Sequence, residues 1–188
     1  MRLEKLRQSL AEENLDAILV SGAENRRYLS GFTGSAGHLL ISPDRAVLAT
    51  DFRYYEQVAR EASAFELARI TTTMAALLPQ LLAEGGIRRL GFESEHMTVA
   101  EHHALKEATE GVEWVPLKET VARLRAVKDE AEIELLRRSA ALNDAAYDHL
   151  VRTIRPGMTE REAAWEIEAY MRSHGASKVA FDLIVAAG

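Results

Sequence analysis

The sequence predicts an α/β fold for its first 120 residues, because strand-like and helix-like segments alternate there. Short apolar runs bounded by turn residues predict buried strands, and apolar residues at spacings of three and four predict helices. The pattern changes after Lys118, where long helical segments replace the alternation. We therefore expect one domain over residues 1–120 and the beginning of another over residues 121–188.

The first predicted element is a helix whose leucines recur at helical spacing; they are Leu3, Leu6, Leu10 and Leu15. The following elements are strands over 16–22, 38–42 and 46–50, a helix over 74–84, a strand over 89–93, a helix over 98–110 and a strand over 112–116. Pro43-Asp44-Arg45 separates two apolar runs and predicts a hairpin. Thr98 and Glu101 have the spacing of a capping box. One central sheet flanked by helices is expected.

The second part begins with one long predicted helix, because residues 129–154 contain no glycine or proline and carry an apolar stripe. Asn143 interrupts this stripe and is expected to be a buried amide at a domain contact. Thr159 and Glu162 predict a capping box for a second helix that ends at Gly175. Residues 181–185 predict an apolar strand that leads into a glycine turn. The boundary between the domains is expected within residues 117–125.

The composition is that of an ordinary globular protein, with 47% apolar residues and a net charge of −6 from 23 basic and 29 acidic side chains. No basic face indicates nucleic-acid binding. There is no cysteine, which excludes disulfides and thiolate chemistry. The first seven residues alternate charge with leucine, unlike a signal peptide, and the apolar runs are too short to span a bilayer. We expect a cytoplasmic protein without a membrane partner.

A glycine-rich stretch over residues 31–37 raises the question of phosphate binding. A loop that cradles phosphate normally opens a helix, where free amides face the anion, whereas this loop opens a strand. Ser35 lacks the spacing of a nucleophile elbow. We interpret the stretch as a structural turn.

The histidines and carboxylates do not predict a metal site. No H-E-x-x-H pair occurs among the six histidines, and the adjacent His102 and His103 must point in different directions from one helix. Asp144, Asp148 and His149 could be drawn as a metal face, but carboxylates one turn apart more often form a solvated helix flank. We expect no catalytic residue and no metal ligand in this chain.

A polar cluster follows the strand at 46–50, where Asp51, Arg53 and Tyr54 lie close together in the sequence. Residues at strand ends of α/β domains often bind ligands. A role at the mouth of a substrate site and a local role, with Asp51 capping and pairing with Arg53, fit the sequence equally.

Several motifs resemble a known family. Residues 25–35 (NRRYLSGFTGS) and 50–54 (TDFRY) look like signatures of the creatinase N-terminal domain. Residues 125–133 (RAVKDEAEI) and 155–162 (RPGMTERE) resemble the entry to the catalytic domain of Xaa-Pro peptidases, such as aminopeptidase P and prolidase, of metallopeptidase family M24. The resemblance implies a creatinase-type domain with a mixed sheet, followed by an incomplete pita-bread α+β segment.

The resemblance also implies a chemistry. Members cleave peptide bonds next to proline with two divalent ions, commonly manganese, cobalt or zinc, held by two aspartates, a histidine and two glutamates; these ligands are expected beyond Gly188. Of the family's site positions, Phe181 and Ile184 match apolar residues that line the substrate pocket, although strand core is an equal interpretation. Arg53 and Tyr54 are the other candidate substrate-binding residues. The chain alone is expected to be inactive and to serve in substrate gating and as part of a homodimer.

Two other functions stay open at this point. The parent protein could be a creatinase-like hydrolase of a small guanidino compound, which substrate profiling would distinguish. Alternatively, the fold could serve as a non-catalytic module that binds peptides without metal. A continuation of the reading frame that contains the five ligands would favour the peptidase.

Overall fold

The computed structural model describes residues 2–187 and divides into two compact units, residues 1–127 and residues 128–188. The two units are described separately. Helix α6 (Thr120–Ala126) belongs to the first unit. The division at residue 120 therefore stays a prediction about which part of the chain folds independently.

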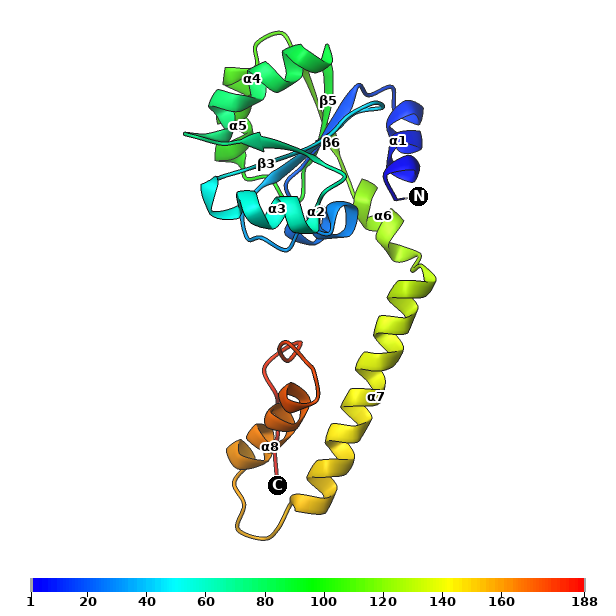
Figure 1. Ribbon diagram of the computed structural model, residues 1–188, viewed down its shortest axis with the longest axis vertical. Coiled ribbons are helices and arrows are strands. Elements are labelled where there is room, and N and C mark those ends of the chain that lie inside the picture. Colours follow the sequence, from blue (N-terminus) through cyan, green and yellow to red (C-terminus); the bar gives the residue numbers. More distant parts are fainter. Residues whose placement is uncertain (1, 188) are drawn as a thin grey trace. The chain divides into compact units, whose positions relative to one another are not determined.

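The first unit is built on one six-stranded mixed sheet with the order β4-β3-β2-β1-β5-β6. Figure 1 shows this sheet with helices packed around it. The strands are β1 (Ala17–Val20), β2 (His38–Ile41), β3 (Ala46–Thr50), β4 (Glu66–Arg69), β5 (Arg89–Glu93) and β6 (Glu113–Leu117). The pairs β1–β2 and β2–β3 are antiparallel, and the remaining three pairs are parallel. The predicted α/β class, the mixed sheet and the hairpin at residues 38–50 are confirmed.

Side chains alternate across the sheet and fill a core on each face, as the period of two along a strand requires. In β1, Ala17 and Leu19 face one core, whereas Ile18 and Val20 face the other. Because both faces are covered, the four residues of β1 are all buried and read as a continuous apolar run. At the β6 edge, Pro116 lacks the amide that a further strand would require.

Helices cover both faces of the sheet. The face towards Leu19 packs against α4 (Met74–Gly85) and α5 (Val99–Ala108). The opposite face is covered by four α-helices, which are α1 (Arg2–Glu12), α2 (Ala23–Ser30), α3 (Tyr55–Glu61) and α6. The short 3₁₀ helix η1 (Phe52–Tyr54) joins β3 to α3. The first unit is thus a three-layer α/β/α sandwich.

The second unit consists of helix α7 (Glu130–Thr153), helix α8 (Glu160–Ser173) and the segment that follows them. Capping boxes begin both helices, with Asp129 and Glu132 in α7 and Thr159 and Glu162 in α8. The two helices pack on each other, yet Ala146 and Ala163 are the only buried apolar residues of this unit among residues 128–187. This small core indicates a much less stable unit than the first.

The structure corrects three of the local predictions. Residues 181–185 form no strand, because no segment of the described residues 2–187 pairs with them and an isolated strand gains no ladder hydrogen bonds. Asn143 is exposed instead of buried. At α5, the Thr98 side chain accepts from the Glu101 amide, but the Glu101 carboxylate lies 2.9 Å from His38 Nε2 and does not return to the cap.

Candidate functional site

Arg53 lies just beyond the carboxyl end of β3, where Asp51 holds it in place. The Asp51 carboxylate accepts from the Arg53 backbone amide at 3.1 Å and from Arg53 Nε and Nη2 at 2.8 Å each. These hydrogen bonds from the Arg53 side chain lower the pKa of Asp51 and raise the pKa of Arg53. The local role predicted for Asp51 is therefore present, and the fork of the guanidinium is already engaged by a carboxylate.

Tyr54 is oriented by three contacts of different kinds. Its hydroxyl lies 2.6 Å from Ser35 Oγ, its ring meets Phe32 edge-on with centroids 5.7 Å apart, and the Arg53 guanidinium lies 5.2 Å from its ring centroid. The partner of Ser35 is thus a phenol and not a general base. The arrangement gives a partly exposed surface with a cation, a phenol and a hydroxyl, which is suited to hydrogen bonding with a ligand.

The glycine-rich loop at residues 31–37 is organised from inside by Arg26. The buried guanidinium donates to the carbonyl oxygen of Gly37 at 2.7 Å and to that of Gly34 at 2.9 Å. A phosphate loop instead presents backbone amides to its ligand. The contacts therefore give this loop a structural role and fix Ser35 between two anchored carbonyls.

Phe181 and Ile184 lie in the segment that follows α8, and the structure does not bring them into one pocket. A cavity of about 310 Å³ lies between this segment and the two helices, and Phe181, Leu183, Asn143 and Met171 are among its lining residues. Ile184 is 91% exposed and does not line the cavity. The exposed Asn143 thus lines the same cavity as Phe181. The apolar stripe of residues 129–154 did not predict this position for Asn143.

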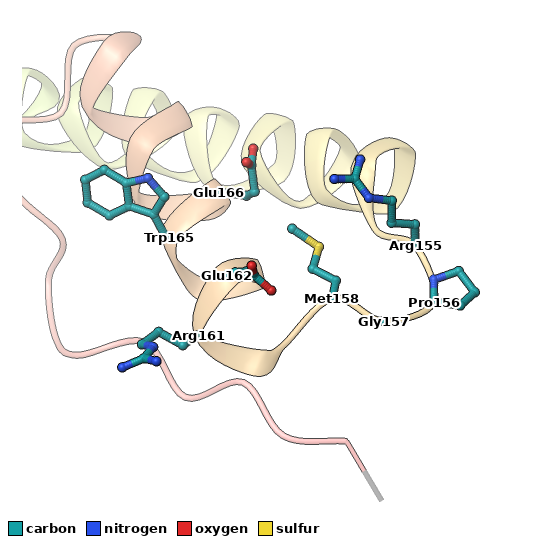
Figure 2. Close-up of a pocket in the computed structure, with 8 residues that line it drawn as sticks. All are labelled: Arg155, Pro156, Gly157, Met158, Arg161, Glu162, Trp165 and Glu166. Carbon is teal, nitrogen blue, oxygen red and sulfur yellow. The ribbon is translucent and has the colours of Figure 1, made fainter.

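A second, larger cleft of about 530 Å³ lies where α7 turns into α8, and Figure 2 shows its eight lining residues. The two carboxylates of this cleft are engaged within the protein. Glu162 accepts from the amide and the hydroxyl of Thr159, both at 2.8 Å, and Glu166 lies 3.3 Å from His149 Nε2. The rest of the lining consists of the exposed Trp165, two arginines, Arg155 and Arg161, and the turn residues Pro156, Gly157 and Met158. This residue set has no nucleophile or free base for catalysis.

The described residues do not form a site for the metal pair that the family resemblance implies. No group of three histidine, aspartate or glutamate side chains converges anywhere between residues 2 and 187. Of the proposed metal face, His149 is paired with Glu166 and stacks on Tyr170 with ring centroids 4.7 Å apart. His102 is packed between Phe92 and Trp114, and burial lowers its pKa. These residues do not fit a dinuclear centre.

The described residues also include no helix that is both long and apolar enough to cross a membrane.

Two family models match the chain. Residues 2–127 match the creatinase/prolidase N-terminal domain, and residues 134–188 match metallopeptidase family M24. Among curated proteins, the uncharacterized peptidase YqhT of Bacillus subtilis is 39% identical over 188 residues, which is 100% of this chain and 53% of YqhT. The chain thus spans about half the length of the curated relatives it matches.

Solved structures give the same result. A Xaa-Pro dipeptidase from Bacillus anthracis superposes with a TM-score of 0.90 at 38% identity, covering 96% of this chain and 51% of that one. The N-terminal domain of the cytoplasmic peptidase PepQ from Mycobacterium tuberculosis is 43% identical, with a TM-score of 0.61, and covers 65% of this chain and 97% of that one. The chain therefore belongs to the creatinase/prolidase N-terminal domain family, and from residue 134 onward it matches the metallopeptidase M24 family.

Proposed function

We propose that this chain is part of a metal-dependent peptidase that hydrolyses the bond next to proline in peptides. The observation that supports this most strongly is the match of the whole chain to about half of proteins named as Xaa-Pro dipeptidases. In such an enzyme, two divalent ions such as manganese, cobalt or zinc would activate the attacking water. The residues of this chain would contribute to substrate binding and assembly.

Phe181 and Ile184 are our candidates for the apolar wall of the substrate pocket. Both residues are largely exposed, at 73% and 91%, and are therefore available to a ligand. Apolar walls suit the proline ring because it carries no donor and buries apolar area. We expect Ile184→Ala to raise KM for a Xaa-Pro dipeptide with a smaller effect on kcat.

Arg53 and Tyr54 are our candidates for contacts with the polar part of the substrate. Tyr54→Phe removes the hydroxyl that lies beside Ser35 Oγ and leaves the ring contact with Phe32 in place. We expect this variant, like Arg53→Ala, to weaken substrate binding. Arg60→Ala is the matched control, since Arg60 lies on the neighbouring helix α3 and its side chain is 75% exposed.

The deciding experiment expresses the full reading frame that contains these 188 residues. The purified product is loaded with manganese or cobalt and assayed with a Xaa-Pro dipeptide, a longer Xaa-Pro peptide and a small guanidino compound. Turnover of either proline peptide supports the proposal. Turnover of the guanidino compound alone would favour a creatinase-like hydrolase, and peptide binding without turnover would favour a binding module.

We also propose that the protein is a cytoplasmic homodimer that associates through its first unit. The relative PepQ is called a cytoplasmic peptidase, which supports the location. Phe52, which is 79% exposed and precedes Arg53 in the chain, is an apolar residue that association could cover. Sedimentation at micromolar concentration should show a dimer, and a monomer at every concentration would contradict the assembly.

A further inference from the structure

A buried polar network lies at the carboxyl ends of the parallel strands β1 and β5. The Glu93 carboxylate, at the end of β5, accepts from the backbone amides of Ser21 and Gly22 at 2.8 and 2.7 Å. Its other oxygen accepts from Asn25 Nδ2 at 2.6 Å. Glu93 and Asn25 are 6% and 3% exposed, so these hydrogen bonds are shielded from water.

The direction of hydrogen bonding in this network is fixed by chemistry. A carboxylate can only accept, so Asn25 must turn its NH₂ group to Glu93. The Asn25 carbonyl oxygen then points the other way and accepts from Arg125 Nη1 at 2.9 Å. The Asn25 side chain thereby links the Glu93 carboxylate at the end of β5 to Arg125 in the last turn of α6 by two hydrogen bonds. Asn25 and Arg125 are 100 residues apart in the sequence.

Helix α6 needs such a contact because it is intrinsically weak. It has seven residues, and its N-cap residue Glu119 is in the left-handed region and makes no side-chain cap. Isolated helices shorter than about 12 residues are marginal in water. Val121 anchors its first turn in the core, and the Tyr28 hydroxyl donates to the Leu124 carbonyl at 3.2 Å.

We infer that Glu93, Asn25 and Arg125 form a clamp that fixes the C-terminal end of α6, and with it the point at which the chain leaves the first unit. Two of the sequence signatures begin with members of this clamp, Asn25 in residues 25–35 and Arg125 in residues 125–133. The clamp gives the amide of the first segment and the guanidinium of the second a shared structural role. Glu93 supplies the charge that orients both.

The test is amide hydrogen exchange on the 188-residue chain, comparing residues 123–126 of α6 with strand β2 as the reference for global unfolding. Glu93→Gln keeps an acceptor for Ser21 and Gly22 but presents an NH₂ group towards Asn25. The Asn25 oxygen must then turn to this group, so that Arg125 faces the NH₂ group of Asn25 and loses its acceptor. We expect exchange in α6 to become at least about 10-fold faster relative to β2, equivalent to about 1.4 kcal/mol of local opening.

The matched control is Asp16→Asn. The Asp16 carboxylate also accepts from two backbone amides, those of Arg88 and Arg89 at 2.8 Å each. This variant should leave the ratio of α6 to β2 exchange unchanged. Arg125→Met, which keeps Glu93 and Asn25 intact, should loosen α6 selectively and decides the question if Glu93→Gln does not fold. Equal acceleration of α6 and β2 in Glu93→Gln, selective loosening by Asp16→Asn, or no effect of Arg125→Met would overturn the clamp.

Discussion

Replacement of Arg26 by methionine should destabilise the first unit strongly, although Arg26 lies in a helix and has no carboxylate partner among the hydrogen bonds of its side chain. Arg26 is 3% exposed, and its guanidinium serves the carbonyl oxygens of Gly34 and Gly37. Burial lowers the pKa of Arg26, although the nearby Glu24 and Glu93 counteract this effect. Methionine fills a similar volume but donates no hydrogen bond.

The magnitude follows from the groups left behind. Each buried carbonyl that loses its donor costs about 1–3 kcal/mol, which gives about 2–6 kcal/mol for the two short contacts. Removal of the buried cation offsets part of this loss in unfolding free energy, because the desolvation of the cation no longer opposes folding. We expect a net loss of about 2–4 kcal/mol, which moves a urea midpoint by about 1–2 M for an m-value near 2 kcal/mol/M.

The assay is urea unfolding followed by tryptophan fluorescence. The chain has two tryptophans, the buried Trp114 in the first unit and the exposed Trp165 in the second, so a Trp165→Phe background reports on the first unit alone. Arg27→Met is the control, since Arg27 is the next residue of α2 and is exposed. This variant should change the free energy of unfolding by less than about 0.5 kcal/mol. Equal midpoints for the two variants would refute the role given to Arg26.

Three further predictions concern the same unit. Gly34→Ala should lower the free energy of unfolding in urea by about 1–3 kcal/mol, because an added Cβ would clash with the buried Phe32 ring; an unchanged midpoint would contradict this packing. The amides of Arg88 and Arg89 hold the pKa of Asp16 below its ordinary 3.8, so its contribution to stability is present above that value and is lost as the pH falls through the folded pKa. Asp16→Asn should accordingly flatten the dependence of the unfolding free energy on pH below about pH 4, and a slope equal to that of the wild type would argue against it. Limited trypsin digestion should release a fragment that ends at Lys128, which is exposed and lies between α6 and α7, whereas cleavage concentrated within residues 47–90 would show that the boundary between the domains is wrong.

The layered fold could be predicted because its signals are local. Continuous apolar runs predicted β1 and the hairpin, and helical spacing predicted α1 and α7. The glycines after residue 84 and the capping residues at 98–101 marked α4 and α5. Strand β4 was not predicted, since Glu66–Arg69 is short, half polar and lies at the edge of the sheet. The strand predicted at residues 181–185 failed for the opposite reason: its composition suits a strand, but pairing depends on partners that no local pattern reveals.

The polar contacts at the candidate sites were largely hidden from sequence reasoning. Asp51 and Arg53 are two residues apart, so their pairing could be anticipated. Glu93 and Asn25 are 68 residues apart, and their contact depends on β1 and β5 lying side by side in the sheet. A signal did exist, because Asn25 and Arg26 lie on the same buried side of α2 as Leu29, where polar residues require internal partners.

Our central proposal is that this chain would supply peptide-binding and assembly elements of a proline-specific metallopeptidase but not its metal centre. The most direct measurement is dialysis of the 188-residue chain against manganese or cobalt, followed by determination of bound metal and assays with a Xaa-Pro dipeptide and a longer Xaa-Pro peptide. We expect no tightly bound pair of ions and no turnover, because no convergent set of ligands occurs in the described residues 2–187. Two tightly held ions per chain, or turnover that a chelator abolishes, would contradict the claim.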